Sequence, residues 1–294
     1  MADQKKAVPE NVAGNFFVDS TCINCDTCRQ LAPDTFGDAG ETAFVKAQPR
    51  AGDQEKKALH ALVCCPTASI GTRDKSKVQE AIADFPMRID AEVFYCGFNS
   101  ADSYGANSFF VRHKDGNWLI DSPRFVKSLV KQFEKLDGIK YIFLTHQDDV
   151  ADANKYASEF GASRIIHAWD AKAEPDSEIV IEGEEPKRFS DDFQIIPVPG
   201  HTKGHMVLLY KDFYLFTGDH LFFDYSQRLS ATKQYCWYSW ERQTESMSKL
   251  KDFSFEWVLP GHGRRGHLKK AEMHKQLSDL VERMRSLAGK WSED

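Results

Sequence analysis

The arrangement of the cysteines constrains this chain more than any other feature. Cys22, Cys25 and Cys28 follow one another at a three-residue spacing, and Cys64 and Cys65 stand side by side further along the chain. An odd total of seven cysteines, three of them packed into one short loop, makes a poor disulfide framework. The pattern instead indicates thiolates that bind metal in a reducing compartment.

The spacing favours an iron–sulfur cluster over zinc. Three thiols at i, i+3 and i+6 can occupy three corners of a compact cluster, and a remote Cys-Pro can close the fourth because proline turns the chain away. This C-x2-C-x2-C pattern with a distant C-P is typical of a [4Fe–4S] centre, whereas structural zinc sites usually bring two C-x2-C pairs. Zinc and a redox-active thiol loop are the alternatives. Cys65 directly precedes Pro66 and is the predicted fourth ligand; whether Cys64 takes that place instead is not decided by the sequence.

Residues 14–73 resemble a single-cluster ferredoxin of the bacterial type. The resemblance rests on FFVDSTCINCDTCRQLAPDTF, ETAFVKA and CCPTASIG, and a second cysteine triplet is absent. It implies a small α+β domain with one [4Fe–4S] cluster. The cluster would also act as a staple, because so short a segment buries little core. The ligands that it implies are Cys22, Cys25, Cys28 and Cys65.

The remaining two thirds of the chain alternate predicted strands and helices, with polar loops where strands end. Strands are predicted at 107–113, 117–123, 139–146, 164–170, 193–200, 205–211, 213–219 and 255–263. Helices are predicted at 123–136, 152–161, 241–253 and 269–287. The last of these carries an apolar stripe of Met273, Leu277, Leu280 and Met284.

Four loops carry His or Asp at the point where a predicted strand stops: TH at 145–146, PGHTKGH at 199–205, TGD at 217–219 and PGHG at 260–263. In this order they resemble the metallo-β-lactamase-fold superfamily. Its members include lactamases, glyoxalase II-like thioesterases, lactonases, nucleases and di-iron redox proteins. The resemblance covers residues 86–294 and implies an αββα fold, joined to the ferredoxin-like domain by a linker at 74–85.

The same resemblance implies a metal site. The family holds one or two metals through T-H-x-H-x-D-H, a later His, a bridging Asp and a last His. An Asp takes the place of the second His in this chain, and a carboxylate can bind iron, manganese or zinc. The residues that match ligand positions are His146, Asp148, His201, Asp219 and His262.

Two family ligands are missing. Val150 and Ala151 stand where the Asp and His of the second metal position belong, and neither side chain can coordinate a metal. A two-metal hydrolytic site is therefore not expected. The sequence leaves open one metal (iron, zinc or manganese), an empty pocket, or a shifted loop that brings in Asp149 or Asp152.

Other residues near these loops have two interpretations each. His205 is expected to orient its loop, and His220 is either structural or a substitute ligand. The aromatic segment 235–240 either lines a substrate pocket or packs as core beneath a helix. Arg264 either holds an anionic substrate or faces water.

Composition argues against two classes of partner. The content of 41% hydrophobic and 28% charged residues is that of a soluble globular protein. No apolar run approaches the ~18 residues of a membrane helix, and the net charge of −6 argues against a nucleic-acid partner. The first residues lack the apolar stretch of a secretory signal. We expect neither a membrane nor a nucleic acid as partner.

Three classes of function fit these observations, and the sequence does not decide whether the chain is an enzyme. The favoured one is a redox protein in which a [4Fe–4S] centre serves a metal or small-molecule substrate in the second domain, with an electron-transfer protein as partner. The second is a metal-dependent hydrolase of an ester, thioester or lactone. The third is a non-catalytic redox-sensing or ligand-binding protein. Related fusions in plants and photosynthetic microbes imply the plastid stroma or the cytoplasm.

Overall fold

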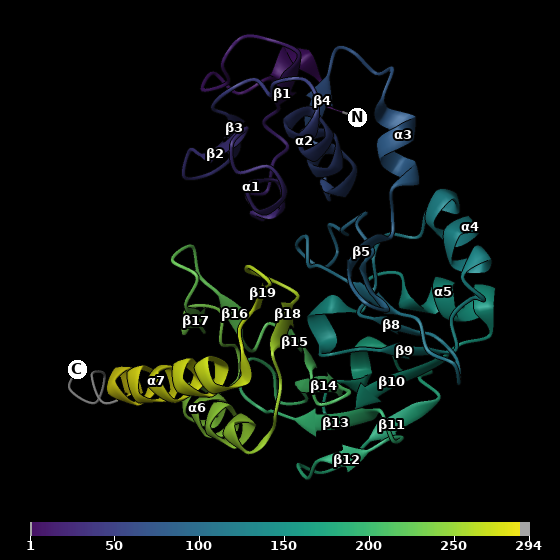
Figure 1. Ribbon diagram of the computed structural model, residues 1–294, viewed down its shortest axis with the longest axis vertical. Helices are drawn as coiled ribbons and strands as arrows, with labels where there is room; N and C mark the ends of the chain where they lie inside the picture. The colour runs from purple at the N-terminus through teal and green to yellow at the C-terminus, as the bar shows by residue number, and fades with distance from the viewer. Residues whose placement is uncertain (1, 289–294) are drawn as a thin grey trace. The chain divides into compact units, whose positions relative to one another are not determined.

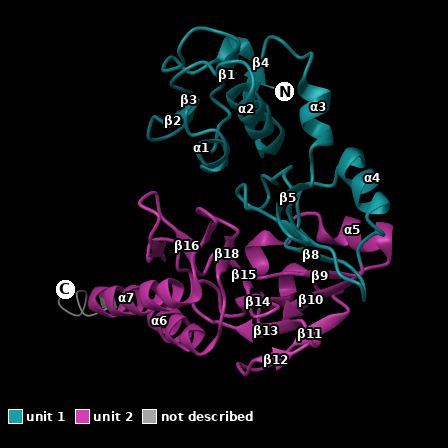
Figure 2. Ribbon diagram, viewed as in Figure 1, with its two compact units in different colours: residues 1–139 teal, residues 140–294 magenta. Residues whose placement is uncertain are grey.

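The computed structural model describes residues 2–288, which divide into two compact units. The first unit comprises residues 1–139 and the second residues 140–294 (Figure 2). This division falls after the predicted linker at 74–85, so the first unit contains the cysteine-rich segment together with the first strands of the following segment. The predicted domain boundaries stay a prediction.

The cysteine-rich segment is a small α+β arrangement of two helices and two strand pairs (Figure 1). β1 pairs with β4 and β2 with β3, both antiparallel. Alternate apolar residues of these strands are buried, Phe16, Val18 and Val45 among them. Its elements are β1 (Phe16–Val18), α1 (Thr27–Leu31), β2 (Phe36–Asp38), β3 (Ala43–Val45), α2 (Asp53–Cys64) and β4 (Ile70–Thr72), preceded by a 3-10 turn, η1 (Gln4–Lys6).

The rest of the first unit is an antiparallel meander flanked by two helices. After α3 (Val78–Ala83), the strands are β5 (Met87–Asp90), β6 (Val93–Tyr95), β7 (Phe109–Val111) and β8 (Trp118–Ile120), followed by α4 (Lys127–Lys135). Helix α4 begins later than the predicted start at Pro123. The preceding backbone is bonded elsewhere, since Arg124 N donates to Phe98 O, and Val126 is extended.

The second unit opens with a parallel β-α-β arrangement. β9 (Tyr141–Phe143), β10 (Ser163–His167) and β11 (Ile179–Ile181) are parallel, and α5 (Ala153–Phe160) connects β9 to β10. Gly161 ends α5 in the left-handed conformation that a helix C-terminus favours (φ +63°). The carboxyl ends of parallel strands meet at one sheet edge, so the loops after β9 and β10 lie together there.

A six-stranded sheet follows, and its pairing gathers three loops at one edge. β14 runs antiparallel to β15, while β18 runs parallel to β15. The start of β14 and the ends of β15 and β18 therefore lie at the same edge. The strand order is β12 (Lys187–Arg188), β13 (Phe193–Pro197), β14 (Met206–Tyr210), β15 (Tyr214–Gly218), β18 (Trp257–Pro260) and β19 (Gly266–His267).

Helices α6 (Trp240–Lys249) and α7 (Lys270–Ala288) cover one face of this sheet and form a core with residues of β14, β15 and β18. The predicted stripe on α7 is confirmed, because Met273, Leu277, Leu280 and Met284 are all buried. Each such side chain contributes about 1.5–3 kcal/mol through its burial. The sequence analysis did not predict α3, β5, β6, β11, β12 or β19. Further short elements that it did not predict are β16 (Phe222–Phe223), β17 (Leu229–Ser230), and the 3-10 turns η2 (Gln147–Asp149), η3 (Ala171–Ala173) and η4 (Leu250–Asp252).

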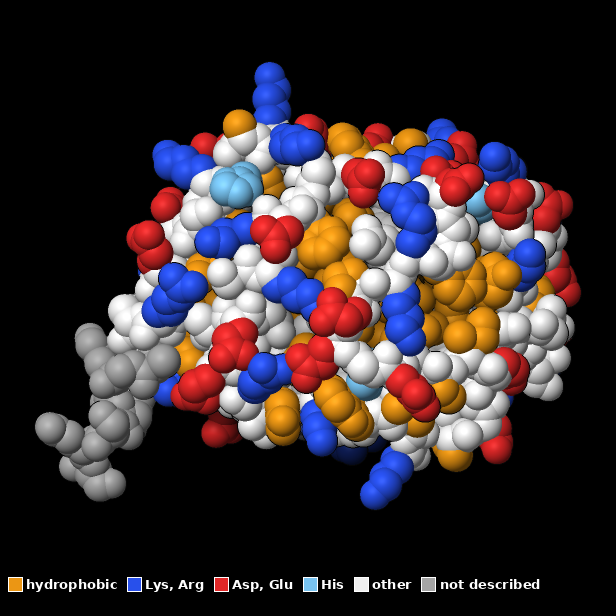
Figure 3. Space-filling view, turned by 90° about the horizontal axis from the view of Figure 1, so that it is seen from below, with side chains coloured by type: hydrophobic (Ala, Val, Ile, Leu, Met, Phe, Trp, Pro, Cys, Tyr) orange, Lys and Arg blue, Asp and Glu red, His pale blue; other side chains and the backbone are white. Residues whose placement is uncertain are grey.

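The surface mixes both signs of charge. On the face drawn in Figure 3, Lys and Arg side chains alternate with Asp and Glu, and that face shows no continuous basic patch. Among the described residues, no helix combines the length and the apolar character needed to cross a membrane.

Candidate functional site

Four cysteines line one small cavity in the first unit. The lining includes Cys22, Cys25, Cys28 and Cys65, together with Pro66. Cys64 is fully buried but is not part of the lining. Within residues 2–288, no disulfide bond joins any of the seven cysteines. We call these four residues the cysteine cradle; their role as ligands stays a prediction.

Local sequence explains why the loop of the cradle curls. Asn24 and Asp26 adopt positive φ angles of 55° and 70°, which Asn and Asp tolerate better than other residues with side chains. Arg29 then holds both of them, because its guanidinium donates to Asn24 Oδ1 and to Asp26 Oδ1. The sharp turns between the thiols are thus encoded in the residues between them.

The cradle suits an anionic, thiolate-ligated cluster. Backbone N–H groups of Asn24 and Ala43 point at Cys22 Sγ at 3.4 Å, and Ser69 N lies 3.2 Å from Cys65 Sγ. Burial raises the pKa of the Cys25 and Cys28 thiols, so their thiolate forms need a positive partner. Iron ions supply that charge, and N–H groups directed at sulfur tune the cluster. The donor set therefore fits a [4Fe–4S] group.

A second segment of the first unit presses against the cradle. A Cβ at Gly105 would lie 2.9 Å from Cys25 Sγ, so only glycine fits there, and its φ of +86° also favours glycine. Asn99 is fully buried, and its Nδ2 donates to Gly105 O at 2.7 Å and to Thr27 Oγ1 at 3.3 Å. Tyr104 Oη donates to Ile23 O at 2.6 Å. We call the segment 99–105 the cradle-contacting loop.

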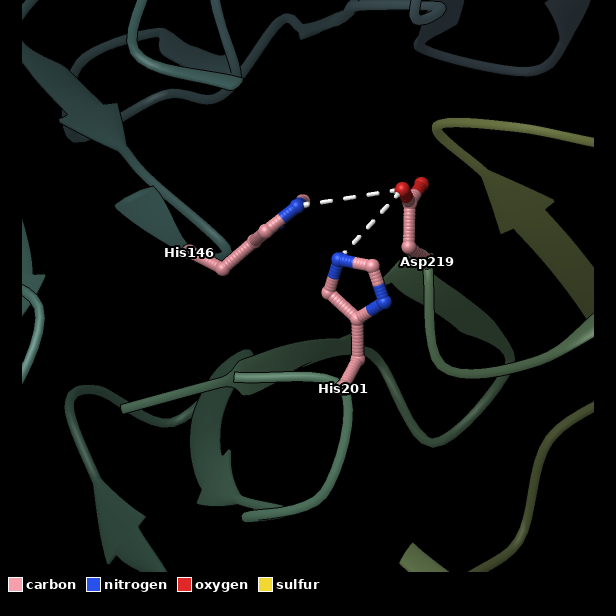
Figure 4. Close-up of side chains that lie close together, drawn as sticks. All are labelled: His146, His201 and Asp219. Carbon is pink, nitrogen blue, oxygen red and sulfur yellow. Dashed lines mark ion pairs between the residues drawn. The ribbon is translucent and has the colours of Figure 1, made fainter. Parts of the chain in front are cut away.

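In the second unit, three loops bring His146, His201 and Asp219 together (Figure 4). The Nε2 atoms of His146 and His201 lie 3.8 Å and 3.7 Å from Asp219 Oδ2. His146 follows β9, His201 lies in the loop before β14, and Asp219 follows β15. The three side chains come from two sheets, because His146 follows β9 of the parallel β-α-β arrangement, whereas His201 and Asp219 flank strands of the six-stranded sheet.

Both histidines present a metal-binding nitrogen to this pocket. His146 is fully buried and His201 is 3% exposed, and neither Nε2 has a hydrogen-bond partner among the described residues. Burial lowers the pKa of His146 well below its usual value, which keeps the imidazole neutral. Thr145 Oγ1 lies 2.9 Å from His146 Nδ1, so an Nδ1–H can donate to it and leave the Nε2 lone pair for a ligand.

Asp219 is held as a carboxylate. Burial alone would raise the pKa of Asp219, but the charge of His262 and its hydrogen bond outweigh burial and hold that pKa below its ordinary value. His262 Nδ1 lies 2.8 Å from Asp219 Oδ1, and the His262 N–H donates to the same oxygen at 3.2 Å. A carboxylate and two imidazoles make a donor set that fits iron, zinc or manganese.

The two neighbouring aspartates after His146 face different surroundings. Asp148 keeps 43% of its side chain exposed, with Oδ2 3.4 Å from His201 Nε2. Asp149 is 1% exposed and groups with Asp219 and His262, their nearest ligand atoms all within 4.8 Å of one another. Asp152, the other aspartate proposed for a shifted loop, instead pairs with Lys155 at 2.6 Å. Metal binding by any of these residues stays a prediction.

Asp170 is a positioning residue that the sequence did not single out. It is 2% exposed, and its carboxylate accepts hydrogen bonds from Gln147 N, Thr202 Oγ1 and Gly204 N, at 3.1, 2.5 and 2.9 Å. One side chain thus ties the loop of His146 to the loop of His201. The only signal was a carboxylate at the end of a predicted strand, which is not specific.

The structure also separates the interpretations of nearby residues. His205 Nε2 donates to Thr217 O at 3.0 Å, and its ring stacks on His146 with a 4.6 Å centroid separation, so it orients the pocket. His220 is buried but is not in either group of possible ligands.

Within 235–240, Trp240 packs in the core, whereas Trp237 is 64% exposed with its ring 6.3 Å from His201. Arg264 stacks on Tyr225 at 4.4 Å.

Comparisons with known proteins agree with this geometry. The family model "4Fe-4S single cluster domain of Ferredoxin I" matches residues 18–72, and the model of the metallo-beta-lactamase superfamily matches residues 102–262. These matches, with the similar structures below, confirm the predicted fold class, an α+β ferredoxin-like domain followed by an αββα metallo-β-lactamase-fold domain. A search of curated proteins found no match.

Three of the similar solved structures are metallo-β-lactamases. VMB-1 at pH 5.5 is 18% identical, with a TM-score of 0.53 over 69% of this chain and 96% of that one. FIM-1 from Pseudomonas aeruginosa, in its mono-zinc form, is 16% identical, with a TM-score of 0.53 over 67% and 93%. A metallo-β-lactamase from Pontibacter korlensis is 16% identical, with a TM-score of 0.50 over 68% and 97%. At such identities the likeness shows the fold alone.

Adjacent cysteines offer a matched test of the cradle. We expect Cys65→Ala to lose the visible absorbance of the cluster, because Cys65 lines the cavity, and Cys64→Ala to keep it, because Cys64 does not. The measurement is absorbance and acid-labile sulfide per chain after purification without oxygen. Loss in the Cys64 variant with retention in the Cys65 variant would reverse the assignment.

Asp170 should matter for metal binding without touching the metal. Replacing it with Ala leaves Gln147 N and Gly204 N without their acceptor, so we expect about 10–100-fold weaker Zn²⁺ binding. Calorimetric titration of the full chain measures this. Asp191→Ala, at an exposed position of the same unit, is the control. Equal affinities in the two variants would show that the loops do not need Asp170.

Proposed function

Because the chain belongs to the metallo-β-lactamase superfamily and carries a single-cluster 4Fe–4S domain, we propose that it is an iron–sulfur redox protein. Its [4Fe–4S] centre would exchange electrons with a metal ion held in the depleted pocket by His146, His201 and Asp219. In the second unit, Val150 and Ala151 stand where the family has two ligands of a hydrolytic metal pair. Their loss weakens the case for a purely hydrolytic function.

One observation carries this proposal: the cysteine cradle is packed directly against the metallo-β-lactamase segment. Gly105, which lies inside the stretch matched by the superfamily model, approaches Cys25 so closely that a methyl group would collide with Sγ. A purely structural cluster would not require the second domain to approach its ligands. Backbone in van der Waals contact with a cluster ligand would be the first step of an electron path out of the cradle.

Buried hydrogen bonds hold the junction, by which we mean the contact between Gly105 and Cys25. Asn99 is fully buried and joins Gly105 O to Thr27 Oγ1, and Tyr95 Oη donates to Asn99 Oδ1 at 2.7 Å. Thr27 Oγ1 in turn lies 3.4 Å from Cys25 Sγ. A bound cluster supplies one-electron oxidation and reduction, with a potential that depends on hydrogen bonding and solvent exposure around its sulfurs. Burial of this network limits solvent on one side of the cradle.

Two metal loadings of the same protein test the function. After flash reduction, we expect the cluster of protein with ferric iron in the pocket to reoxidise within the molecule, as the iron takes up one electron. With zinc, which has no redox chemistry, the reduced cluster should persist. The measurement is cluster absorbance against time at several protein concentrations. Equal reoxidation with both metals would contradict electron exchange with the pocket.

The junction itself offers a matched pair of variants for that experiment. Gly105→Ala should slow the iron-dependent reoxidation at least ~10-fold, because the added methyl displaces the loop from Cys25. Gly40→Ala is the control, since Gly40 has a similar positive φ of 92° but no atom within 4 Å of an added Cβ. Iron and sulfide contents should stay equal in both proteins. Equal rates would mean that this contact does not carry the electron.

Metal-dependent hydrolysis of an ester, thioester or lactone is the second candidate. It is favoured by Asp149, whose buried carboxylate lies in the pocket, with Oδ2 4.0 Å from His146 Nδ1, where it could orient a water. The zinc-loaded protein decides between the two candidates. Turnover of such substrates that disappears in His201→Ala would support hydrolysis.

We also propose an electron-transfer protein as the source of electrons and a small molecule as the final ligand of the pocket. The net charge of −6 would suit a basic partner. Seven cysteines with no disulfide among them in residues 2–288 suit a reducing compartment, with the plastid stroma and the cytoplasm as the two candidates.

A further inference from the structure

We propose that Asp19 and three hydroxyl side chains form a hydrogen-bond relay that lowers the reduction potential of the cluster. The relay leads from Asp19 to the predicted fourth ligand through Thr21, Ser69 and Thr67, and ends at Cys65 Sγ. Asp19 is a positioning residue, because its carboxylate acts on the cluster through the hydroxyls. This inference rests on the proposed function, since it needs a cluster in the cysteine cradle. It deepens that function by naming what keeps the reduced cluster a strong electron donor.

The relay is a continuous series of four contacts. Thr21 Oγ1 donates to Asp19 Oδ1 at 2.5 Å. Ser69 Oγ lies 2.7 Å from Thr21 Oγ1 on one side and 2.6 Å from Thr67 Oγ1 on the other. Thr67 Oγ1 in turn lies 3.8 Å from Cys65 Sγ. Within residues 2–288, the three hydroxyl groups have no other hydrogen-bond partner.

The pairing of β1 with β4 brings the two ends of the relay together. Val18 is opposite Ile70 in the antiparallel register, and one step beyond this pair Asp19 N donates to Ser69 O at 2.9 Å. Asp19 is 2% exposed and Ser69 is fully buried. Ser69 N also donates to Cys65 Sγ at 3.2 Å, so the same turn holds the sulfur beside the hydroxyls. The relay is therefore built into the small sheet of the cysteine-rich segment.

Asp19 is held as a carboxylate. Burial alone would raise the pKa of Asp19, but hydrogen bonds from the Thr21 hydroxyl and from the backbone of Asp3 and Thr21 outweigh burial and hold that pKa below its ordinary value. Asp3 N donates to Asp19 Oδ2 at 2.8 Å, and Thr21 N donates to Asp19 Oδ1 at 3.0 Å. An ionised carboxylate only accepts hydrogen bonds. Thr21 therefore directs its hydroxyl hydrogen toward Asp19.

A count of hydrogens gives the direction of the relay. A thiolate bound to iron accepts hydrogen bonds, as the carboxylate does, and each hydroxyl between them has one hydrogen to donate. Three hydrogens therefore serve four contacts, so one contact has none. The contact between Thr67 and Cys65 is the longest of the four at 3.8 Å, and we assign the missing hydrogen to it. All three hydroxyls thus donate toward Asp19, and none donates to the sulfur.

This direction affects the cluster because hydrogen bonds to its sulfurs set its potential. Reduction adds one electron to the cluster, and a donor directed at a ligand sulfur stabilises the extra negative charge. No bond forms or breaks in the relay. By drawing the Thr67 hydrogen away from Cys65 Sγ, Asp19 withholds one such donor. The reduced cluster is then less stable and gives up its electron more readily.

Two hydroxyl variants of the full chain, and their combination, test the direction of the relay. In Ser69→Ala, Thr67 keeps Cys65 Sγ as its partner and donates to it. We expect the equilibrium constant for reduction to rise about tenfold, which is about 59 mV for one electron. Thr67→Val should leave the potential unchanged, and the double variant should return to the wild-type value, because no hydroxyl then adjoins the sulfur. The measurement is a redox titration of the visible absorbance without oxygen.

A double-mutant cycle separates the relay from the charge of Asp19. Asp19→Asn weakens the pull on the hydroxyl hydrogens, but it also removes a negative charge, and both changes raise the potential. Two residues that act through one network give non-additive effects. We therefore expect a smaller shift from Asp19→Asn in the Ser69→Ala protein than in wild type. Equal shifts would mean that Asp19 acts by its charge alone and would refute its positioning role.

The outcomes separate this inference from the proposed function. Iron and sulfide per chain are measured in every variant, so that only proteins with intact clusters are compared. An unchanged potential in Ser69→Ala would refute the relay and leave electron exchange with the pocket standing. A lower potential in Thr67→Val would also refute it, because Thr67 would then donate to the sulfur in wild type; this variant decides alone if the others lose the cluster.

The converse result is also distinguishable. A raised potential in Ser69→Ala, together with equal reoxidation of the iron-loaded and zinc-loaded proteins, would support the relay and contradict electron exchange with the pocket. Wild-type protein that binds no cluster would refute both.

Discussion

Both the cysteine cradle and the pocket in the second unit bury side chains that become anions when they bind a metal, and such anions need a positive charge beside them. The cradle encloses thiols whose pKa values are raised by burial at Cys25 and Cys28, and the pocket encloses two carboxylates beside imidazoles. Neither set is stable as a group of anions in a low-dielectric interior. Metal ions bound at both sites would supply the missing positive charge, and the same ions would then stabilise the surrounding loops.

Strand pairing then determines which ligands meet. β15 and β18 are parallel and β14 is antiparallel to them, so the residues that precede β14 and follow β15 and β18 share an edge of the sheet. Asp170 holds the loop of His146 and the loop of His201 in position, because its carboxylate accepts a hydrogen bond from the backbone of each. In the first unit, Asn99 has the comparable role of holding Gly105 against the cradle. Function depends on these few buried polar side chains as much as on the ligands.

Sequence reasoning reached the fold and most of the pocket because the informative residues lie where predicted strands end. The proline after Cys65 also favoured Cys65 as the fourth ligand, although the sequence did not decide between it and Cys64. The orientation of Asp149 was out of reach, because a one-residue difference within a 3-10 turn decides which aspartate faces inward. Asp170 was missed because its partners lie more than twenty residues away along the chain. The close approach of Gly105 to Cys25 is likewise a contact between residues far apart in the sequence, so the local sequence pattern around either residue does not predict it.

Metal and sulfide content tests the central claim most directly. Iron, zinc, manganese and acid-labile sulfide are measured per chain on protein purified without oxygen, in wild type and in His201→Ala. The account predicts about four iron ions with equal sulfide, plus additional metal that disappears in the variant while the sulfide stays. Iron equal to sulfide with no further metal in wild type would contradict it, because the pocket would then be a vacant remnant rather than the partner of the cluster.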